Sequence, residues 1–234
     1  MKKYYFTSES VTEGHPDKLC DYISDSILDE CLKQDKDSRV AVETFANGNK
    51  INIAGQITSK SKINAEEIVR NTIKEIGFDN EKIDMDYRTC KIYADIIEQS
   101  PDIALGVDTG GAGDQGIMFG YACDETENYM PYAINMAHKL SKRLTEVRKK
   151  KIIPFLRPDG KTQVTVEYEG DIPKRIETIL ISTQHEESVT TEEVRKEVIK
   201  HVINEIIPEK MMDKNTKIYI NPTGRFVIGG PLGD

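Results

Sequence analysis

The sequence has no tryptophan, few cysteines and no long apolar run, and each of these shortages excludes a class of protein. The four cysteines are scattered and form no Cys-x-x-Cys pair, so neither a disulfide framework nor a zinc site is expected. No apolar run approaches the roughly 20 residues that cross a bilayer. The apolar run after Met1-Lys2-Lys3 is also too short for a signal peptide. We therefore expect a cytoplasmic protein with reduced thiols and no membrane partner.

Positive charge is also in short supply. The 234 residues include 32 lysines and arginines against 40 aspartates and glutamates, which gives a formal net charge of -8. This balance argues against nonspecific binding to nucleic acid or to a membrane surface, because both favour a basic protein. A polyanionic ligand such as a nucleoside triphosphate would need specific cationic side chains, or metal ions held by carboxylates. The length suffices for one large domain or two ordinary ones.

The order helix, hairpin, helix, strand occurs twice along the chain. Apolar spacing and turn signals predict the first copy as a helix over 16–34, strands over 39–45 and 51–58, a helix over 65–76 and a strand over 91–97. The second copy is predicted as a strand over 117–121, a helix over 132–149, strands over 162–167 and 176–182, a helix over 192–206 and a strand over 217–220. This pattern predicts an α+β fold with helices on one face of each small sheet. The open sheet faces would pack on a sister domain or a second subunit, and residues 99–113 would form a joint or a mobile lid.

A glycine-rich run at 111–116 satisfies the spacing G-x-G-x-x-G. The dinucleotide fingerprint needs a strand before this spacing and a helix after it, and neither is predicted here. We interpret the run as a tight loop that brings Asp114 and Gln115 close to a ligand. A plain turn is the alternative.

The start of the first helix is a candidate phosphate site. His15 and Asp17 flank Pro16, which suits the first helical position. Free N–H groups at a helix N-terminus attract phosphate. His15 would donate a hydrogen bond to a phosphoester oxygen, and Asp17 would hold Mg²⁺ that bridges to the phosphates. The alternative is an ordinary helix start, in which Asp17 interacts with the helix dipole.

Two further segments could supply cations. Pro158-Asp159-Gly160 predicts a turn from which Asp159 and Lys161 project, with Lys161 available for a phosphate. Arg225 and Phe226 combine a cation with a stacking face, as nucleotide binding requires. The apolar residues after Arg225 argue against a disordered tail.

Three other polar residues are ambiguous. Glu43 lies in a predicted strand and is either solvated or a cation ligand. Gln56 and Gln99 stand next to glycine or proline breaks, where amides contact ligands or simply line surface loops.

Five segments together make the chain resemble the S-adenosylmethionine synthetase (methionine adenosyltransferase) family. They are Phe6 to Lys18, Gly111 to Tyr121, Leu156 to Val164, Ser182 to His185 and Asn221 to Asp234. The resemblance implies attack of the methionine sulfur on C5′ of ATP, release of triphosphate, and its hydrolysis to phosphate and pyrophosphate. It also implies Mg²⁺ and K⁺ as cofactors, and a homodimer or dimer of dimers with sites between subunits.

The resemblance further implies roles for individual residues. His15 and Lys161 would be catalytic, Asp17 would bind Mg²⁺ and Glu43 would bind K⁺. The ATP contacts would be His15, Asp114, Asp159, Lys161, Arg225, Phe226 and Asp234. The methionine contacts would be Gln56, Gln99 and Asp234.

Three departures from the family pattern qualify these expectations. Gln56 replaces a usual glutamate, which would weaken the contact with the methionine ammonium by about 1–2 kcal/mol. The lid segment looks short. Only two of the family's three βαββαβ-like domains, which form a pseudo-threefold array, are expected, at 1–104 and 105–234. The chain would then be a truncated enzyme that is weakly active or inactive alone. The alternatives are a non-catalytic nucleotide-binding or regulatory partner of a full-length subunit, and a short enzyme completed by another chain.

Overall fold

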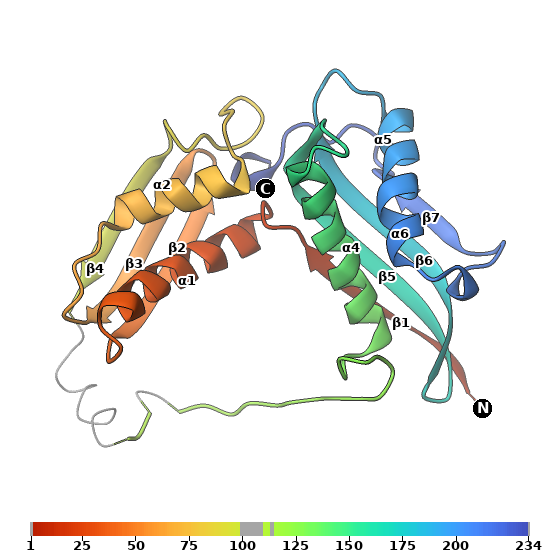
Figure 1. Cartoon of the computed structure of the whole chain (residues 1–234), viewed down its shortest axis with the longest axis horizontal. Coiled ribbons are helices and arrows are strands. Elements are labelled where there is room, and N and C mark those ends of the chain that lie inside the picture. The colour runs from red at the N-terminus through yellow and green to blue at the C-terminus, as the bar shows by residue number, and fades with distance from the viewer. Residues whose placement is uncertain (1, 99–109, 113–114, 234) are drawn as a thin grey trace.

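The chain folds into two αβ halves that lie side by side (Figure 1). This computed structural model describes residues 2–98, 110–112 and 115–233. The first half comprises the helices α1 (Pro16–Gln34) and α2 (Ala65–Ile76) and the strands β2 (Arg39–Asn47), β3 (Lys50–Thr58) and β4 (Lys91–Ile97). β2 and β3 form the expected antiparallel hairpin, and β4 runs parallel to β3.

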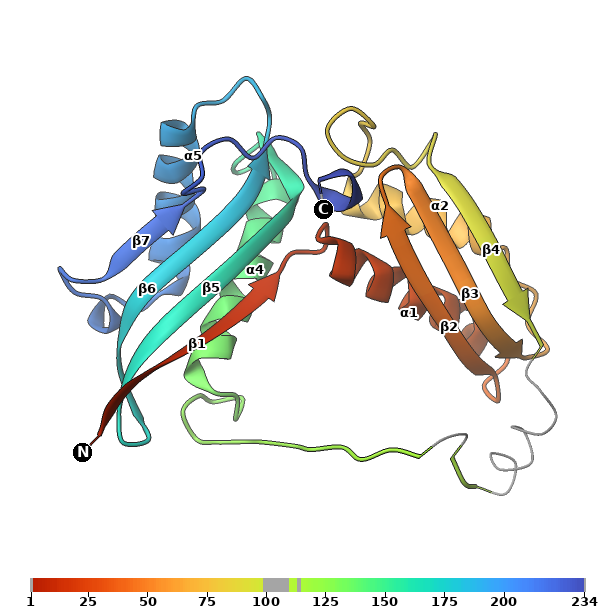
Figure 2. The ribbon, with the colours of Figure 1, turned by 180° about the vertical axis from the view of Figure 1, so that it is seen from behind.

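The second half repeats this order with longer hairpin strands and a shorter last strand. Its principal elements are α4 (Tyr132–Lys149), β5 (Leu156–Glu169), β6 (Ile172–His185), α5 (Thr191–Val198) and β7 (Lys217–Ile220). The predicted helix over 192–206 continues beyond α5 as a π-helical turn (Ile199–Ile203) and α6 (Asn204–Ile206), and short 3-10 helices lie at Glu209–Met211 and Gly230–Leu232. The predicted α+β class and the repeated helix–hairpin–helix–strand order are thus confirmed. Figure 2 shows the sheet faces that the helices leave uncovered.

One strand crosses between the halves, and the sequence pattern missed it. β1 (Lys3–Val11) precedes α1 in the chain, but it pairs antiparallel with β5 in the sheet of the second half. That sheet has the order β1-β5-β6-β7, and the first half has β2-β3-β4. A domain boundary at residue 104 remains a prediction, but the N-terminal strand belongs to the second sheet. β1 therefore places the beginning of α1 beside β5.

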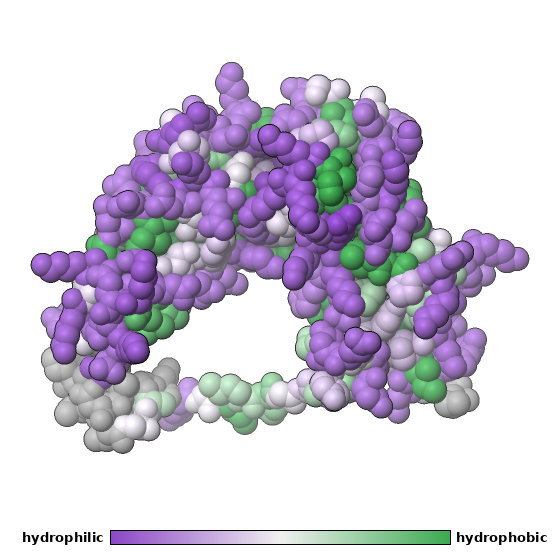
Figure 3. Space-filling model, viewed as in Figure 1, coloured by the Kyte–Doolittle hydropathy of each residue, from purple (hydrophilic) through white to green (hydrophobic). Residues whose placement is uncertain are grey.

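The predicted strand over 117–121 is wrong. These residues form neither helix nor strand, and Phe119 is 89% exposed. A strand satisfies its backbone groups by pairing with a neighbour, and the described part of the chain offers this segment no partner strand. Figure 3 shows it as an apolar stretch within the connection that joins the two halves.

Each half has a hydrophobic core of its own. In the first half, Leu19, Ile23 and Ile27 recur at every fourth position of α1 and are fully buried against α2 and the sheet. In the second half, alternate residues of β5 and β6, such as Val164 and Ile179, pack beneath α4 and α5. Burying each such side chain stabilises the fold by about 1.5–3 kcal/mol. The halves therefore carry separate cores and meet through a different kind of contact.

The joint between the halves is mostly polar. Arg157 of the second half contacts the Asp84 carboxylate with its Nη2 atom at 2.6 Å and Asp79 at 2.9 Å. The Gly229 N–H donates to the carbonyl oxygen of Ile83 at 2.9 Å. The joint between the halves therefore depends on a buried ion pair and on a backbone hydrogen bond.

Asp84 gives the joint a pH dependence. Its side chain is fully buried, and burial raises its pKa to about 6 although Arg157 and Gln184 act in the opposite direction. The unfolded value is about 3.9. A carboxyl with a raised pKa in the folded state binds its proton more tightly there, so its contribution to stability is present below about pH 4 and is lost as pH rises through about 6.

We expect Asp84→Asn to remove this pH-dependent contribution to the free energy of unfolding. From pH 5 to pH 7 the wild type should lose about 1 kcal/mol of unfolding free energy relative to the variant. Urea titrations at several pH values measure this difference. Asp86→Asn is the matched control, because Arg88 lowers the pKa of Asp86 and this residue should therefore contribute no slope above pH 5. Parallel profiles for the wild type and Asp84→Asn would contradict the expectation.

Candidate active site

His15 caps the N-terminus of α1. Its backbone is extended, Pro16 occupies the first helical position, and its Nδ1 atom accepts the N–H of Asp17 at 3.2 Å. A neutral imidazole whose Nδ1 accepts a hydrogen bond carries its proton on Nε2. The ring is therefore held at the helix start with one donor, Nε2–H, left for a ligand. A free donor at a helix N-terminus suits an anionic ligand such as phosphate.

Asp159, Gly160 and Lys161 lie within β5, so the predicted turn at 158–160 is wrong. The pairing of β5 with β6 shifts register between Leu156 and Gly160. Thr12 stabilises the extended path, because its Oγ1 donates to the carbonyl oxygen of Pro158 at 2.7 Å and its N–H donates to that of Gly160 at 2.9 Å. The strand thereby presents Lys161 beside the start of α1.

The segment that follows β7 forms the third wall of the site. His185 is buried and bonds the Phe226 backbone twice, since its N–H donates to the Phe226 carbonyl at 2.9 Å and its Nε2 accepts the Phe226 N–H at 3.2 Å. Further along, the Gly230 N–H donates to Oδ2 of Asp159 at 2.8 Å. The segment is therefore attached to both β6 and β5.

These three walls enclose a cavity of about 200 Å³. Residues from all of them contribute: His15, Asp159, Gly160, Lys161, Ser182, Phe226, Gly229 and Gly233. Four predicted site residues, His15, Asp159, Lys161 and Phe226, thus come together from three separate parts of the sequence. Pockets for whole small molecules measure about 300–1,000 Å³, so this cavity has room for part of a nucleotide.

A second cavity of about 520 Å³ also borders the start of α1. It is lined by Asp17 and Asp21, by Phe45 and neighbouring residues of β2, and by Pro231. The Asp17 side chain is 84% exposed. Mg²⁺ in nucleotide sites uses one or two carboxylates together with phosphate oxygens, and this pair of carboxylates fits that requirement. Within the described residues no three acidic, histidine or cysteine side chains form a group that could hold a metal ion by itself.

The two cations expected to meet phosphate are each paired with a carboxylate. Lys161 Nζ lies 2.8 Å from Glu9 Oε1, and Arg225 Nη2 lies 2.5 Å from Glu187 Oε1. All four side chains are substantially exposed, and such pairs contribute little to stability. A bound phosphate could therefore replace either carboxylate at small cost. The acidic composition of the chain is compatible with a phosphate site for this reason.

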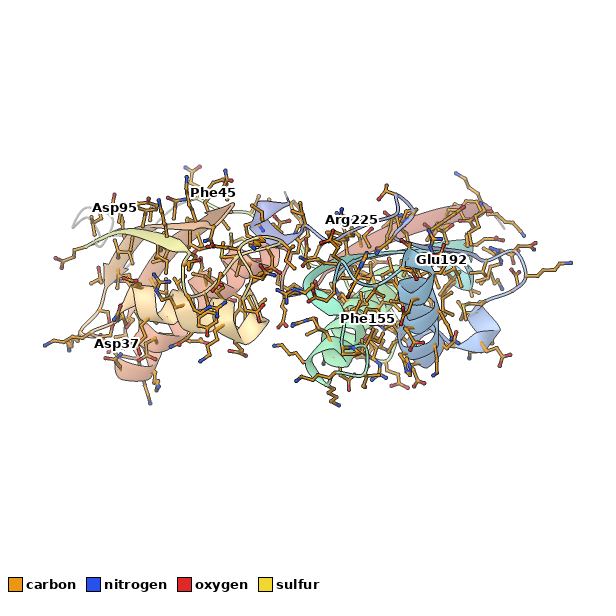
Figure 4. The ribbon with its side chains drawn as sticks, turned by 90° about the horizontal axis from the view of Figure 1, so that it is seen from above. Asp37, Phe45, Asp95, Phe155, Glu192 and Arg225 are labelled. Atoms are coloured by element: carbon orange, nitrogen blue, oxygen red, sulfur yellow. The ribbon has the colours of Figure 1, made fainter. Side chains whose placement is uncertain are left out.

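The structure does not bring every candidate to these cavities. Glu43 and Gln56 lie in β2 and β3 on the uncovered face of the first sheet, where Gln56 pairs with Ala41. Figure 4 shows this face through Phe45 and Asp95, which lie on the sheet side of that half, away from its helices. The remaining candidates are either away from both cavities, as Arg225 is, or outside the described residues, as Gln99, Asp114 and Asp234 are.

Sequence reasoning gave no role to three buried polar residues that shape the site. Gln184 and His185 bond to the walls just described, and Asn221 forms a two-way hydrogen bond with the backbone of Thr183 at 2.8 and 2.9 Å. Polar side chains directly after the apolar strand 176–181 were the available signal. Buried polar groups nearly always have specific partners, and here those partners belong to the cavity walls.

The fold and the site define an α+β protein of two similar units, with a small cavity lined by His15 and Lys161 where the units meet. Family models for the S-adenosylmethionine synthetase N-terminal and central domains match residues 3–101 and 109–226. The chain belongs to the S-adenosylmethionine synthetase family.

Proteins named S-adenosylmethionine synthase resemble the chain over 98–100% of its length. The protein from Brachyspira hyodysenteriae is 54% identical over 247 residues, which cover 100% of this chain and 63% of that protein. Those from Finegoldia magna and Clostridium tetani are 53% and 54% identical, with 63% and 62% of their lengths covered. The chain therefore spans a little under two thirds of these relatives. No helix in the described residues has the length and apolar character to span a membrane.

Proposed function

We propose that this chain supplies the N-terminal and central parts of a methionine adenosyltransferase. The enzyme would form S-adenosylmethionine from ATP and L-methionine and release phosphate and pyrophosphate. Family membership and the names of the relatives support this activity. The observation that carries the proposal is the convergence of His15, Asp159, Lys161 and Phe226 on one cavity.

The chemistry suits this set of side chains. In the transfer step the methionine sulfur forms a bond to C5′ of ATP while the C5′–O bond breaks, and the electron pair leaves with the triphosphate. A thioether has no proton to lose, so the attack needs no general base. The difficulty lies in the leaving group, and fixed positive charge and hydrogen-bond donors stabilise the charge that develops on it. His15 Nε2–H and Lys161 would supply these, and Phe226 would stack on the adenine.

The cofactors and remaining contacts belong to the same proposal. Asp17, with Asp21 beside it, would hold Mg²⁺, which would neutralise the triphosphate when bound. Glu43 would give K⁺ one oxygen ligand. The other assignments inferred from the family are methionine contacts at Gln56, Gln99 and Asp234, and ATP contacts at Asp114, Arg225 and Asp234.

We also propose a homodimer or a dimer of dimers in the cytoplasm. The uncovered face of the first sheet exposes Phe45, Tyr93 and Ile97 by 53–62%, as a face that meets another subunit would. Glu43 and Gln56 lie on this face, so a site between subunits would bring them to a ligand. Four free thiols are compatible with a reducing compartment.

A product assay tests the activity. We expect the chain alone to form little S-adenosylmethionine from ATP, methionine and Mg²⁺, because it spans under two thirds of its relatives. Adding the remaining C-terminal part of the Brachyspira hyodysenteriae relative should raise the rate about tenfold or more, since phosphate-binding groups would be restored. Product is quantified by mass spectrometry.

The outcomes separate the competing functions. A full rate from the pure chain would contradict the expected dependence on further residues. ATP binding without product, even with the added polypeptide, would instead favour a non-catalytic nucleotide-binding partner. If the chain neither binds ATP nor forms product with the added polypeptide, the proposal is rejected.

A further inference from the structure

Gln184 connects three segments that are distant in sequence. Its side chain is fully buried at the end of β6. Its Oε1 accepts the N–H of Asp159 at 3.3 Å, while its Nε2 donates to the carbonyl oxygens of Val227 at 2.9 Å and Ile83 at 3.2 Å. The same nitrogen lies 3.4 Å from Oδ2 of Asp84. One amide thus joins β5, the segment after β7 and the 79–86 loop of the first half.

Two of these segments are walls of the proposed nucleotide cavity. Asp159 and Gly229 both line it, and both are in contact with Gln184. A Cβ atom added at Gly229 would lie 2.8 Å from Cδ of Gln184 and 3.1 Å from Oδ2 of Asp159. The Gly229 backbone therefore rests directly on the amide. The size and hydrogen bonding of this side chain therefore act on the spacing between the two walls, together with the direct hydrogen bond from Gly230 to Asp159.

We propose that Gln184 is a positioning residue for the nucleotide cavity, which holds Asp159 and the 226–230 segment at binding distance and couples them to the 79–86 loop. This inference rests on the proposed function, since it assigns the support of the same cavity. Gln184 itself does not line the cavity, so it acts through Asp159, Gly229 and Gly230.

The chemistry of the position favours glutamine. The site needs one acceptor toward Asp159 and donors toward Val227 and Ile83, and a primary amide provides both. Methionine has a similar shape without the hydrogen bonds. Glutamate keeps the shape but, when ionised, loses the donors and adds a negative charge beside Asp84 and Asp159. Protonation returns a single O–H donor to the glutamate side chain.

The test compares three variants by titration of Mg·ATP into the 234-residue chain. Gln184→Met should weaken ATP binding about tenfold or more, because buried hydrogen bonds that fix the walls are lost. Gln184→Glu should be similarly weak at pH 7.5 and recover toward the wild type at pH 5.5, when the introduced carboxyl binds a proton. Asn135→Leu is the matched control, since Asn135 is a buried amide in α4 that bonds Asn128 and not the cavity. Affinities are expressed as ratios to the wild type at each pH, because Asp84 and the ATP phosphates also titrate.

The results decide between positioning and general stability. We expect ATP affinity to fall in Gln184→Met but not in Asn135→Leu, at comparable thermal stability of the two variants. We also expect the ATP affinity of Gln184→Glu to recover at pH 5.5. Unchanged ATP affinity in folded Gln184→Met, equal losses in the control, or no recovery of Gln184→Glu would each overturn the inference. If Gln184→Met does not fold, the Gln184→Glu ratios at the two pH values decide alone.

Hydrogen exchange separates this inference from the proposed function. If the wild type fails to bind ATP, the proposed nucleotide role fails, but the positioning role is still measurable. The amides of Asp159 and Gly230 should then exchange about tenfold faster in Gln184→Met than in the wild type, because the Asp159 N–H loses its acceptor and the Asp159 carboxylate that accepts from Gly230 is held less firmly. Unchanged exchange at both amides would reject the positioning role.

Discussion

Replacing Lys161 with methionine is expected to weaken binding of ATP about tenfold and to slow any transfer reaction by about 100-fold or more. Methionine preserves the length and most of the apolar stem of lysine but removes the charge. Lys161 lines the cavity together with His15 and Asp159, and its carboxylate partner Glu9 is more than half exposed and easily displaced. The loss should be larger for the reaction than for binding, because charge on the triphosphate grows as the C5′–O bond breaks.

Lys174→Met is the matched control. Lys174 has a similar exposure of 41%, against 43% for Lys161, and it also pairs with a glutamate, Glu169, at 3.7 Å. It lies in β6 and lines neither of the two cavities beside α1. The control should bind ATP like the wild type. Equal affinities for Lys161→Met and the wild type would remove Lys161 from the site.

The largest expected effect on stability comes from Gly14→Ala. A Cβ atom at Gly14 would lie 2.4–2.6 Å from atoms of Pro158, and two of these are backbone atoms. A backbone contact of this kind cannot be relieved by a side-chain rotation, so the two segments must move apart. We expect a loss of about 3 kcal/mol or more, which is a fall of roughly 6–12 °C in Tm for a chain of this size. ATP affinity should fall as well, because His15 is the next residue and Pro158 precedes Asp159.

Gly120→Ala serves as the control for Gly14→Ala. No atom lies within 4 Å of a Cβ built at Gly120. Its thermal unfolding should therefore match that of the wild type. Thermal melts of both variants provide the measurement, and a Gly14→Ala protein as stable as Gly120→Ala would show that the start of α1 and β5 do not meet closely.

Local patterns predicted the regular elements of the fold well. The expected helices over 16–34, 65–76 and 132–149 and the strands over 91–97 and 217–220 coincide with α1, α2, α4, β4 and β7. Each carries strong apolar periodicity or a clear terminal signal, such as Asn64, whose side chain accepts the N–H of Glu67. Where local propensity and tertiary packing agree, one sequence is sufficient to predict a helix or strand.

The errors arise where pairing with a distant strand decides the structure. β1 is a mostly exposed edge strand whose partner, β5, follows about 150 residues later, so its own residues carry little signal. The segment 117–121 has strand composition but lacks a partner within the described residues. Pro158-Asp159-Gly160 has turn composition, but Thr12 and Gln184 hold it extended. A single sequence does not show which distant segments pair with one another.

The sequence predicts only part of the site, because the remaining residues act through contacts with distant segments. His15 and Lys161 were selected because a helix start and a cation suit phosphate, and the crossing strand β1 then brings them together. Gln184 and His185 act by bonding backbone groups of other segments, which no local pattern specifies. Glu43 and Gln56 lie on the uncovered face of the first sheet and line neither cavity, so their proposed roles stay predictions.

The most direct test of the nucleotide site is an NMR titration of the wild-type chain with Mg·ATP, repeated with Lys161→Met. We expect saturable shifts of the amides that line the small cavity, at residues 160, 161, 182, 229 and 233. In Lys161→Met the same shifts should require about tenfold more ATP. Saturable shifts confined to the separate groove along α2, near Arg70, Lys74 and Tyr87, would contradict the account, and so would identical titrations of the two proteins.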